Sequence, residues 1–184
     1  MARCLALARR GAGAVSPNPM VGAVLVAPDG SPLGEGWHRQ YGGPHAEVHA
    51  IHDAEAQHGP EALRDATLYV NLEPCAHHGK TPPCADLIIE KRIPRVVIGM
   101  EDPFPAVGGQ GMERLRTHGV EVEAGVREAD CLRLNEAFIH HVETGRPLVT
   151  LKIAQTLDGC IATRTGDSQW ISGTAARTKQ CAPW

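Results

Sequence analysis

The sequence predicts an α/β protein in which one sheet lies between two layers of helices, a three-layer α/β/α sandwich. Short apolar runs alternate along the chain with segments of helical composition, and the joints between them are short and contain glycine, proline or aspartate. This alternation is typical of a sheet that carries helices on both faces. The length of 184 residues fits one ordinary domain and part of a second.

The first half of the chain predicts three strands and two helices. Gly11 and Gly13 end a helical N-terminal segment, and the rigid turn Ser16-Pro17-Asn18-Pro19 precedes a continuous apolar run. The segment after Gly42-Gly43-Pro44 is rich in Ala, Glu and His and has no interior Gly or Pro, which favours a helix. In order, we expect a helix at 1–13, a buried strand at 20–26, its hairpin partner at 33–38, a helix at 45–58 and a strand at 67–72.

The second half repeats the pairing of a helix with a strand. We expect a helix at 83–91, a strand at 96–99, a helix at 112–118, a strand at 120–122 and a helix at 127–144. Pro83 is tolerated in the first turn of its helix, and Pro147 breaks the last one. A new strand at 148–153 follows, so the predicted domains are residues 1–145 and 146–184, the second being the first strand of an incomplete α/β domain.

Composition and charge exclude several classes of protein. A formal net charge of −3 and an aromatic content of 4% provide neither the basic surface nor the stacking platforms of a nucleic-acid binder. No stretch approaches the roughly 18 apolar residues of a membrane span, and no secretory segment opens the chain. The six cysteines are irregularly spaced, so we expect reduced thiols in a cytoplasmic protein.

One histidine and two cysteines form the most informative pattern in the chain. His45 lies in His45-Ala46-Glu47, and Cys75 and Cys84 each follow a proline. An imidazole and two thiolates suit zinc, and three protein ligands leave the fourth tetrahedral position for water, as in catalytic sites. Zinc deaminases pair such ligands with a glutamate two residues after the histidine. The pattern therefore predicts hydrolytic deamination, with Glu47 as the acid and base.

His45 and Glu47 can serve one site only from the first turn of a helix. In the middle of an α-helix, residues two apart point about 200° away from each other. The preceding Gly42-Gly43-Pro44 forces a loop entry, so we expect both side chains at the helix start. Cys75 and Cys84 lie in the next strand-to-helix connection, where α/β sheets bind ligands. A helix that begins near Cys84 would favour its thiolate form.

Other interpretations of these residues stay open. A structural zinc site would need a fourth protein ligand, for which His77 and His78 between the cysteines are the candidates. The spacing of His45 and His49 is that of a zinc protease helix, but the glutamate that such a helix requires after the first histidine is Ala46 here. We expect the remaining cysteines to be small apolar residues: Cys4, Cys131, Cys160 and Cys181.

Three further polar residues are candidates for contact with a substrate. Asn18 is held between two prolines, where it either forms the turn or meets a ligand. Lys80 lies between the two cysteines and contacts a phosphate or ribose unless it is a solvated loop charge. Asp102 follows a predicted buried strand at its C-terminal end, which is a favourable place for a ligand contact.

These motifs resemble those of the bifunctional riboflavin-biosynthesis family, in which an N-terminal pyrimidine deaminase precedes a C-terminal reductase. The segment between the cysteines is the specific part, because other cytidine-deaminase-like enzymes usually separate them by two residues. The resemblance runs nearly end to end, through Pro17-Asn18-Pro19, Pro44-His45-Ala46-Glu47-Val48, Leu72-Glu73-Pro74-Cys75, His77-His78-Gly79-Lys80-Thr81-Pro82-Pro83-Cys84, Asp102-Pro103 and Leu157-Asp158-Gly159.

The resemblance implies a cytidine-deaminase-like fold and a small pyrimidine ribotide as substrate. That substrate is 2,5-diamino-6-ribosylamino-4(3H)-pyrimidinone 5′-phosphate, which is hydrolysed to 5-amino-6-ribosylaminouracil phosphate and ammonia. The resemblance also implies a homo-oligomer, a dimer or larger. Carried onto this sequence, it assigns Zn²⁺ to His45, Cys75 and Cys84, proton transfer to Glu47, and substrate contact to Asn18, Lys80 and Asp102.

The residues after about 146 resemble the start of the reductase. Ala154 and Trp170 would lie near NADP, and Lys152 and Ser168 near the reductase substrate. Most of that domain is missing from the 184 residues, so we predict no reductase activity for this chain.

One position departs from the family pattern. The family commonly has asparagine two residues after Asp102, where this sequence has Phe104, so one polar substrate contact is lost or replaced. Deamination of cytosine, guanine or tRNA adenosine is the alternative activity. The spacing of the two cysteines and the lack of a basic, aromatic surface argue against it.

Overall fold

The computed structural model describes residues 1–77, 82–104, 108–168 and 173–175. The chain divides into two compact units, Met1–Pro147 and Leu148–Trp184. The first unit contains the sheet. No helix in the described ranges is long and apolar enough to cross a membrane.

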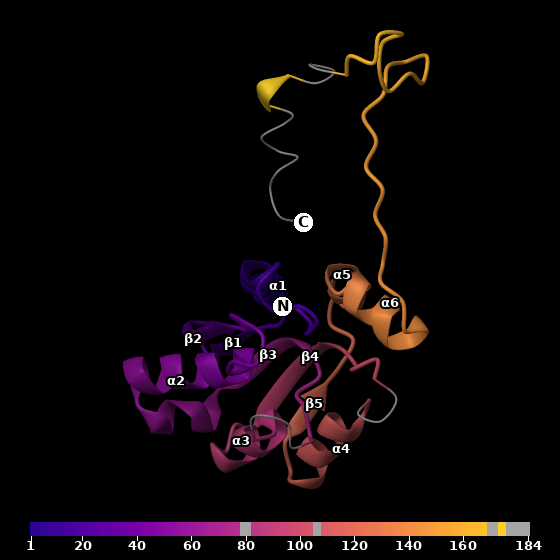
Figure 1. Ribbon diagram of the computed structural model, residues 1–184. Helices are drawn as coiled ribbons and strands as arrows, with labels where there is room; N and C mark the ends of the chain where they lie inside the picture. The colour runs from indigo at the N-terminus through magenta and orange to yellow at the C-terminus, as the bar shows by residue number, and fades with distance from the viewer. Residues whose placement is uncertain (78–81, 105–107, 169–172, 176–184) are drawn as a thin grey trace. The chain divides into compact units, whose positions relative to one another are not determined.

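The first unit is built on a five-stranded mixed sheet with the strand order β2-β1-β3-β4-β5 (Figure 1). Strand β1 pairs in antiparallel fashion with both β2 and β3, whereas β3, β4 and β5 are parallel. The parallel strands therefore end at one edge of the sheet, which is where the loops that carry the site begin. The strands are β1 (Gly22–Val26), β2 (Pro32–Trp37), β3 (Thr67–Leu72), β4 (Arg95–Met100) and β5 (Glu121–Glu123).

Helices cover both faces of the sheet, so the predicted three-layer α/β/α sandwich is confirmed (Figure 1). One layer consists of α2 (Ala46–His58), α3 (Cys84–Glu90) and α4 (Gln110–Thr117). The other layer contains α1 (Ala2–Ala8) and α5 (Glu128–Leu134). Side chains alternate along the strands as the pleat requires. Leu25 and Leu68 pack in the cluster that includes Ile51 of α2, whereas Val24 packs with Leu7 of α1.

Glycines let two helices approach the sheet closely. A Cβ at Gly36 would lie 2.3 Å from the carbonyl oxygen of Ala46, and one at Gly34 would lie 2.4 Å from that of Ala50. On the other face, a Cβ at Gly22 would lie 2.2 Å from the carbonyl oxygen of Cys4. No side chain fits at these positions without moving the helix. The start of α2 is therefore held directly against β2.

The helix predicted at 127–144 is two helices, α5 and α6 (Glu136–Thr144), so that prediction is wrong in this detail. The break falls at Asn135, whose backbone has φ −104° and ψ 20°. The buried side chain of Asn135 accepts a hydrogen bond from the Met20 N–H (2.8 Å) and donates one to the Met20 carbonyl oxygen (3.0 Å). Asn71 of β3 also donates to that oxygen and accepts from the Gly22 N–H. Two buried amides thus hold the backbone between Asn18 and β1.

Other element boundaries differ by a few residues from the sequence prediction. The first helix ends at Ala8 and continues as a 3₁₀ turn over Arg9–Gly11, and the first strand begins at Gly22 because Met20 is bound by the two asparagine side chains. A second 3₁₀ helix at Pro60–Asp65, between α2 and β3, was not predicted.

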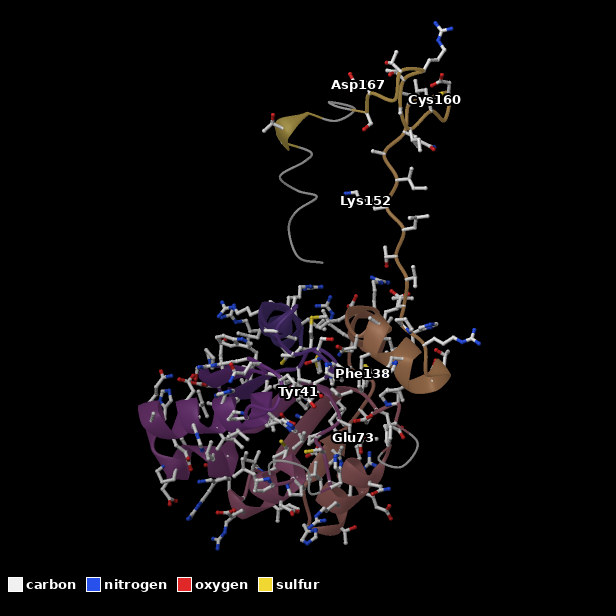
Figure 2. The ribbon with its side chains drawn as sticks, in the orientation of Figure 1. Tyr41, Glu73, Phe138, Lys152, Cys160 and Asp167 are labelled. Atoms are coloured by element: carbon white, nitrogen blue, oxygen red, sulfur yellow. The ribbon has the colours of Figure 1, made fainter. Side chains whose placement is uncertain are left out.

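The second unit contains no strand at residues 148–153, so the predicted strand there is wrong for the described residues. Val149 and Leu151 are 80% and 79% exposed. A strand exists only when a neighbour takes its backbone hydrogen bonds, and no described strand pairs with this segment. The unit instead contains two tight turns, closed by hydrogen bonds from Thr156 N to Cys160 O (3.0 Å) and from Thr163 N to Asp167 O (2.9 Å) (Figure 2).

We predict that Asn135→Ala lowers the free energy of unfolding by about 1–3 kcal/mol, because both Met20 backbone groups lose a buried partner. Urea denaturation followed by circular dichroism measures the change. Glu136→Ala, at the exposed neighbouring position, is the matched control and should shift the free energy by no more than about 0.5 kcal/mol. Equal effects of the two substitutions would contradict the role assigned to Asn135.

Candidate metal centre

Two helix starts and one strand end bring the predicted site residues together. His45 is the N-cap of α2, with φ −73° and ψ 166°, and Glu47 lies in the first helical turn. The expectation that both residues lie at the start of this helix is confirmed. Cys75 is in the loop after β3, and Cys84 is the first residue of α3, directly after the N-cap Pro83. All three potential ligands thus lie where backbone N–H groups are not yet used within a helix or sheet.

The three ligand atoms have the spacing of a tetrahedral zinc site. His45 Nδ1 lies 3.2 Å from Cys84 Sγ and 3.6 Å from Cys75 Sγ, and the three ligand atoms all lie within 4.8 Å of one another. With Zn–S of about 2.3 Å and Zn–N of about 2.0 Å, a tetrahedral site separates a nitrogen and a sulfur ligand by about 3.5 Å. The donors therefore fit one zinc ion.

Hydrogen bonds among these side chains shift their pKa values. The hydrogen bond with Cys84 lowers the pKa of Cys75 to about 4, and the bond to Cys75 raises the pKa of His45 to about 9. The proton shared with Cys75, together with burial, raises the pKa of Cys84. Cys75 also accepts the backbone N–H of Cys84 at 3.3 Å. A cation that binds here would displace the protons that these side chains share.

Glu47 is a buried acid beside the ligand group. Its side chain is 3% exposed, and burial raises its pKa, although the positive charge of His45 acts in the opposite direction. A carboxyl group that is kept from water, yet lies next to a cationic site, can both take up and release a proton. The structure places this group two residues from His45 on the same helix start.

A fourth protein ligand is not found among the described residues. The described His, Cys, Asp and Glu side chains form only one group with metal-ligand spacing, and its members are His45, Cys75 and Cys84. His77, one of the two candidates for a fourth ligand, is exposed and outside this group. His78 lies outside the described residues. For the described part of the chain, the arrangement has the open position of a catalytic site.

His38 is a buried residue of the site that the sequence did not reveal. It follows β2, is 3% exposed, and its ring centroid lies 5.6 Å from that of His45. Its Nε2 has no hydrogen-bond partner in the described part of the protein, and burial lowers its pKa. The available sequence signal was its place at the end of a predicted strand, where α/β proteins gather ligand contacts.

The predicted substrate contacts lie in several places. Asn18 is half-buried, and its N–H donates to the Val15 carbonyl oxygen at 2.8 Å. Asp102 is half-buried after β4, and its Oδ1 accepts the Phe104 N–H at 2.9 Å. Burial raises the pKa of Asp102, and the charge of Glu73 acts in the same direction. The Asp102 N–H donates to Glu73 Oε2 at 3.2 Å, which ties it to the segment two residues before Cys75. Lys80 lies outside the described residues.

Phe104 and the reductase-like residues are exposed where they are described. Phe104, the departure from the family pattern, is 49% exposed and borders a cavity of about 410 Å³ beside Asp102. Ala154 and Ser168 are exposed within the second unit. Trp170 lies outside the described residues. The assignment of these three residues to a reductase stays a prediction.

The fold and the ligand group together define a zinc-dependent deaminase of the cytidine-deaminase-like class. The family described as "Cytidine and deoxycytidylate deaminase zinc-binding region" matches residues 1–100, and the chain belongs to this family. The family described as "RibD C-terminal domain" matches residues 147–181. The predicted family resemblance is thereby confirmed.

Riboflavin biosynthesis protein RibD of Actinobacillus pleuropneumoniae is 49% identical over 179 residues, which cover 97% of this chain and 46% of that protein. The Escherichia coli protein of the same name is 46% identical, with coverage of 96% and 47%. A Thermotoga maritima structure named as a diaminohydroxyphosphoribosylaminopyrimidine deaminase/5-amino-6-(5-phosphoribosylamino)uracil reductase has a TM-score of 0.92 and 53% identity, and covers 98% of this chain and 50% of that one. The chain thus spans about half the length of these relatives.

We predict one zinc ion per purified chain and none in Cys84→Ser, because only two of the three protein ligands then remain to hold the ion. Atomic absorption on dialysed protein measures the stoichiometry. Cys160→Ser changes an exposed cysteine of the second unit and should leave the zinc content unchanged. Zinc retained in Cys84→Ser would show that this thiol is not a ligand.

We further predict that Gly36→Ala weakens zinc binding by about tenfold or more, since its Cβ would press on Ala46, the residue between His45 and Glu47. Competition with a chromogenic chelator measures the affinity. Gly34→Ala presses on the same helix one turn later, at Ala50 and Ala54, and is the matched control. It should lower stability comparably but weaken zinc binding much less. A larger loss of zinc affinity in Gly34→Ala than in Gly36→Ala would contradict the role assigned to Gly36.

Proposed function

We propose that this chain catalyses the zinc-dependent hydrolytic deamination of 2,5-diamino-6-ribosylamino-4(3H)-pyrimidinone 5′-phosphate, which yields 5-amino-6-ribosylaminouracil phosphate and ammonia. The observation that carries the proposal is the buried Glu47 beside one imidazole and two thiolates with zinc spacing. The name of the Thermotoga maritima relative supports the choice of substrate, and its high identity extends over nearly all of this chain.

The residues of the site divide the chemistry among them. Zinc, when bound by His45, Cys75 and Cys84, supplies Lewis acidity that lowers the pKa of a water molecule. Glu47 would take a proton from the attacking water and pass it to the pyrimidine ring nitrogen. It would then take the second proton, from the hydroxyl group that has added to the ring carbon, and deliver it to the departing amine as the carbon–nitrogen bond breaks. Its burial keeps bulk water from competing for these protons.

Residues are assigned to the other parts of the substrate by the chemistry of their side chains. Asp102 is tied through its N–H to Glu73, two residues before Cys75, and would accept a hydrogen bond from an exocyclic amine of the pyrimidine. Asn18 would contact the ring or the ribose, and Lys80 the phosphate. His38, whose pKa is lowered by burial and whose Nε2 has no partner among the described residues, is a further group of this site. In a full-length family member, Ser168, Ala154 and Trp170 are proposed to belong to a reductase site that uses NADP, and no reductase activity is expected of this chain. A homo-oligomer stays a prediction.

The experiment that tests the function is a direct assay for ammonia. Purified protein with measured zinc content is incubated with the diaminopyrimidine ribotide, and separately with cytidine, guanine and a tRNA anticodon stem-loop that has adenosine at the wobble position. The last substrate is included because a tRNA:A34 deaminase shares the fold, with 30% identity and a TM-score of 0.56. Ammonia from the ribotide alone is expected. Turnover of any of the other three instead would overturn the choice of substrate.

We predict that Glu47→Gln keeps its zinc and its fold but loses about 10²–10⁴ in turnover number, since the amide cannot carry the proton. Steady-state kinetics with parallel zinc analysis measures both effects. Glu55→Gln, on the same helix, removes an ion pair to Lys91 and should leave the turnover number nearly unchanged. If Glu47→Gln retained most of its activity, another group would have to transfer the proton.

A further inference from the structure

Glu73 is a buried carboxylate that the mechanism above does not use. It is 4% exposed and follows β3, two residues before Cys75 (Figure 2). Its backbone N–H donates to the Met100 carbonyl oxygen at 2.9 Å, which extends the pairing of β3 with β4 to the point where both loops begin. No described cation forms an ion pair with its side chain within 4 Å. A buried carboxylate without such a partner needs other donors.

Backbone N–H groups from the next loop supply those donors. Glu73 Oε2 accepts the N–H of Asp102 at 3.2 Å and the N–H of Gly109 at 2.9 Å, and Oε1 accepts the N–H of Met112 at 3.0 Å. The three donors come from both ends of the connection between β4 and α4. Gly109 is the N-cap of α4 and Met112 lies in its first turn, so the carboxylate also interacts favourably with the helix dipole.

The first turn of α4 packs closely against the backbone that follows Glu73. A Cβ at Gly111 would lie 2.0 Å from the Pro74 carbonyl oxygen and 3.1 Å from Glu73 Oε1. The first turn of α4 therefore rests directly on the segment that leads to Cys75. Because Asp102 is the other end of the same connection, one side chain fixes its position relative to the metal ligand.

We propose that Glu73 is a positioning residue for the substrate site, which acts by holding the Asp102 backbone against the segment that leads to Cys75. The substrate part of this inference rests on the proposed function, because Asp102 has a role in binding only there. Glu73 does not touch the reacting atoms. Its effect reaches the substrate through the Asp102 N–H and the loop that this N–H anchors.

Glutamine cannot replace Glu73 in this arrangement. An amide side chain has one acceptor oxygen, and its NH₂ group would face at least one N–H donor of the loop. At least one of the three bonds is lost, and hydrogen bonds to a charged group are among the strong ones. We expect Glu73→Gln to raise KM for the ribotide about tenfold, with a much smaller change in kcat. Glu113→Gln, at an exposed position in α4, is the matched control.

The first measurement is amide hydrogen exchange by NMR at Asp102, Gly109 and Met112 in the full chain, and it does not depend on any substrate. Faster exchange at these amides in Glu73→Gln, but not in Glu113→Gln, is expected. Unchanged protection at all three would overturn the proposal. Glu73→Asp keeps the charge with a shorter reach, so it should expose at least one of the three amides even if Glu73→Gln fails to fold.

The second measurement is a double-mutant cycle in KM with Glu73→Gln and Asp102→Asn, at equal zinc content. If Glu73 acts through Asp102, the second substitution adds little to the effect of the first. Fully additive effects would overturn the inference, as would loss of zinc in Glu73→Gln, which would mean that the residue acts through Cys75. Failure of the wild-type chain to deaminate the ribotide would reject the proposed function alone, and the exchange data would still decide whether Glu73 holds the loop.

Discussion

The architecture of the site depends on one geometric constraint: three soft donor atoms must reach a single point from three separate segments. His45 and Cys84 each lie at the start of a helix, and Cys75 follows a strand. The three ligands therefore come from separate segments, and no ligand is positioned by another ligand close to it in sequence. The sheet fixes the strand end, and close packing on Gly36 fixes the start of α2. The start of α3 is tied to Cys75 by the Ala85 N–H, which donates to the Cys75 carbonyl oxygen at 3.1 Å. Because an ion tolerates only small errors in ligand distance, the close contact of Gly36 with Ala46 also affects zinc binding.

Buried polar side chains hold several backbone segments of the first unit in place. Besides Glu47 and His38, the buried polar residues in the described part of the chain are Asn71, Glu73 and Asn135. Each of these three binds backbone groups of a segment that borders the site, and none of them is left without partners. Such groups are costly when unpaired and rigid when fully paired. The loops around the site are thus held by hydrogen bonds from the interior, where water does not compete.

The sequence predicted what depends on pattern and spacing. The alternation of apolar runs gave the three layers, and the constraint that residues two apart diverge on a helix placed His45 and Glu47 in the first turn. The sequence does not predict contacts between segments that are far apart along the chain. No residue close to Asn135 in sequence shows that its side chain binds the Met20 backbone. The sequence therefore predicts one helix where the structure has two. The strand expected at 148–153 failed because apolar composition does not supply a pairing neighbour. Glu73 and His38 carry no local signal that distinguishes them from ordinary strand-end residues.

The contact between Gly36 and Ala46 has a consequence for how such a site can diversify. With no room for a side chain beneath the start of α2, the helix cannot slide or tilt to admit a differently shaped ring. Changes in preference among nucleobases are then expected in the connections that follow β3 and β4, because loops vary more readily than the elements that they join. The metal ligands and the start of α2 would then keep their positions while the two connections differ.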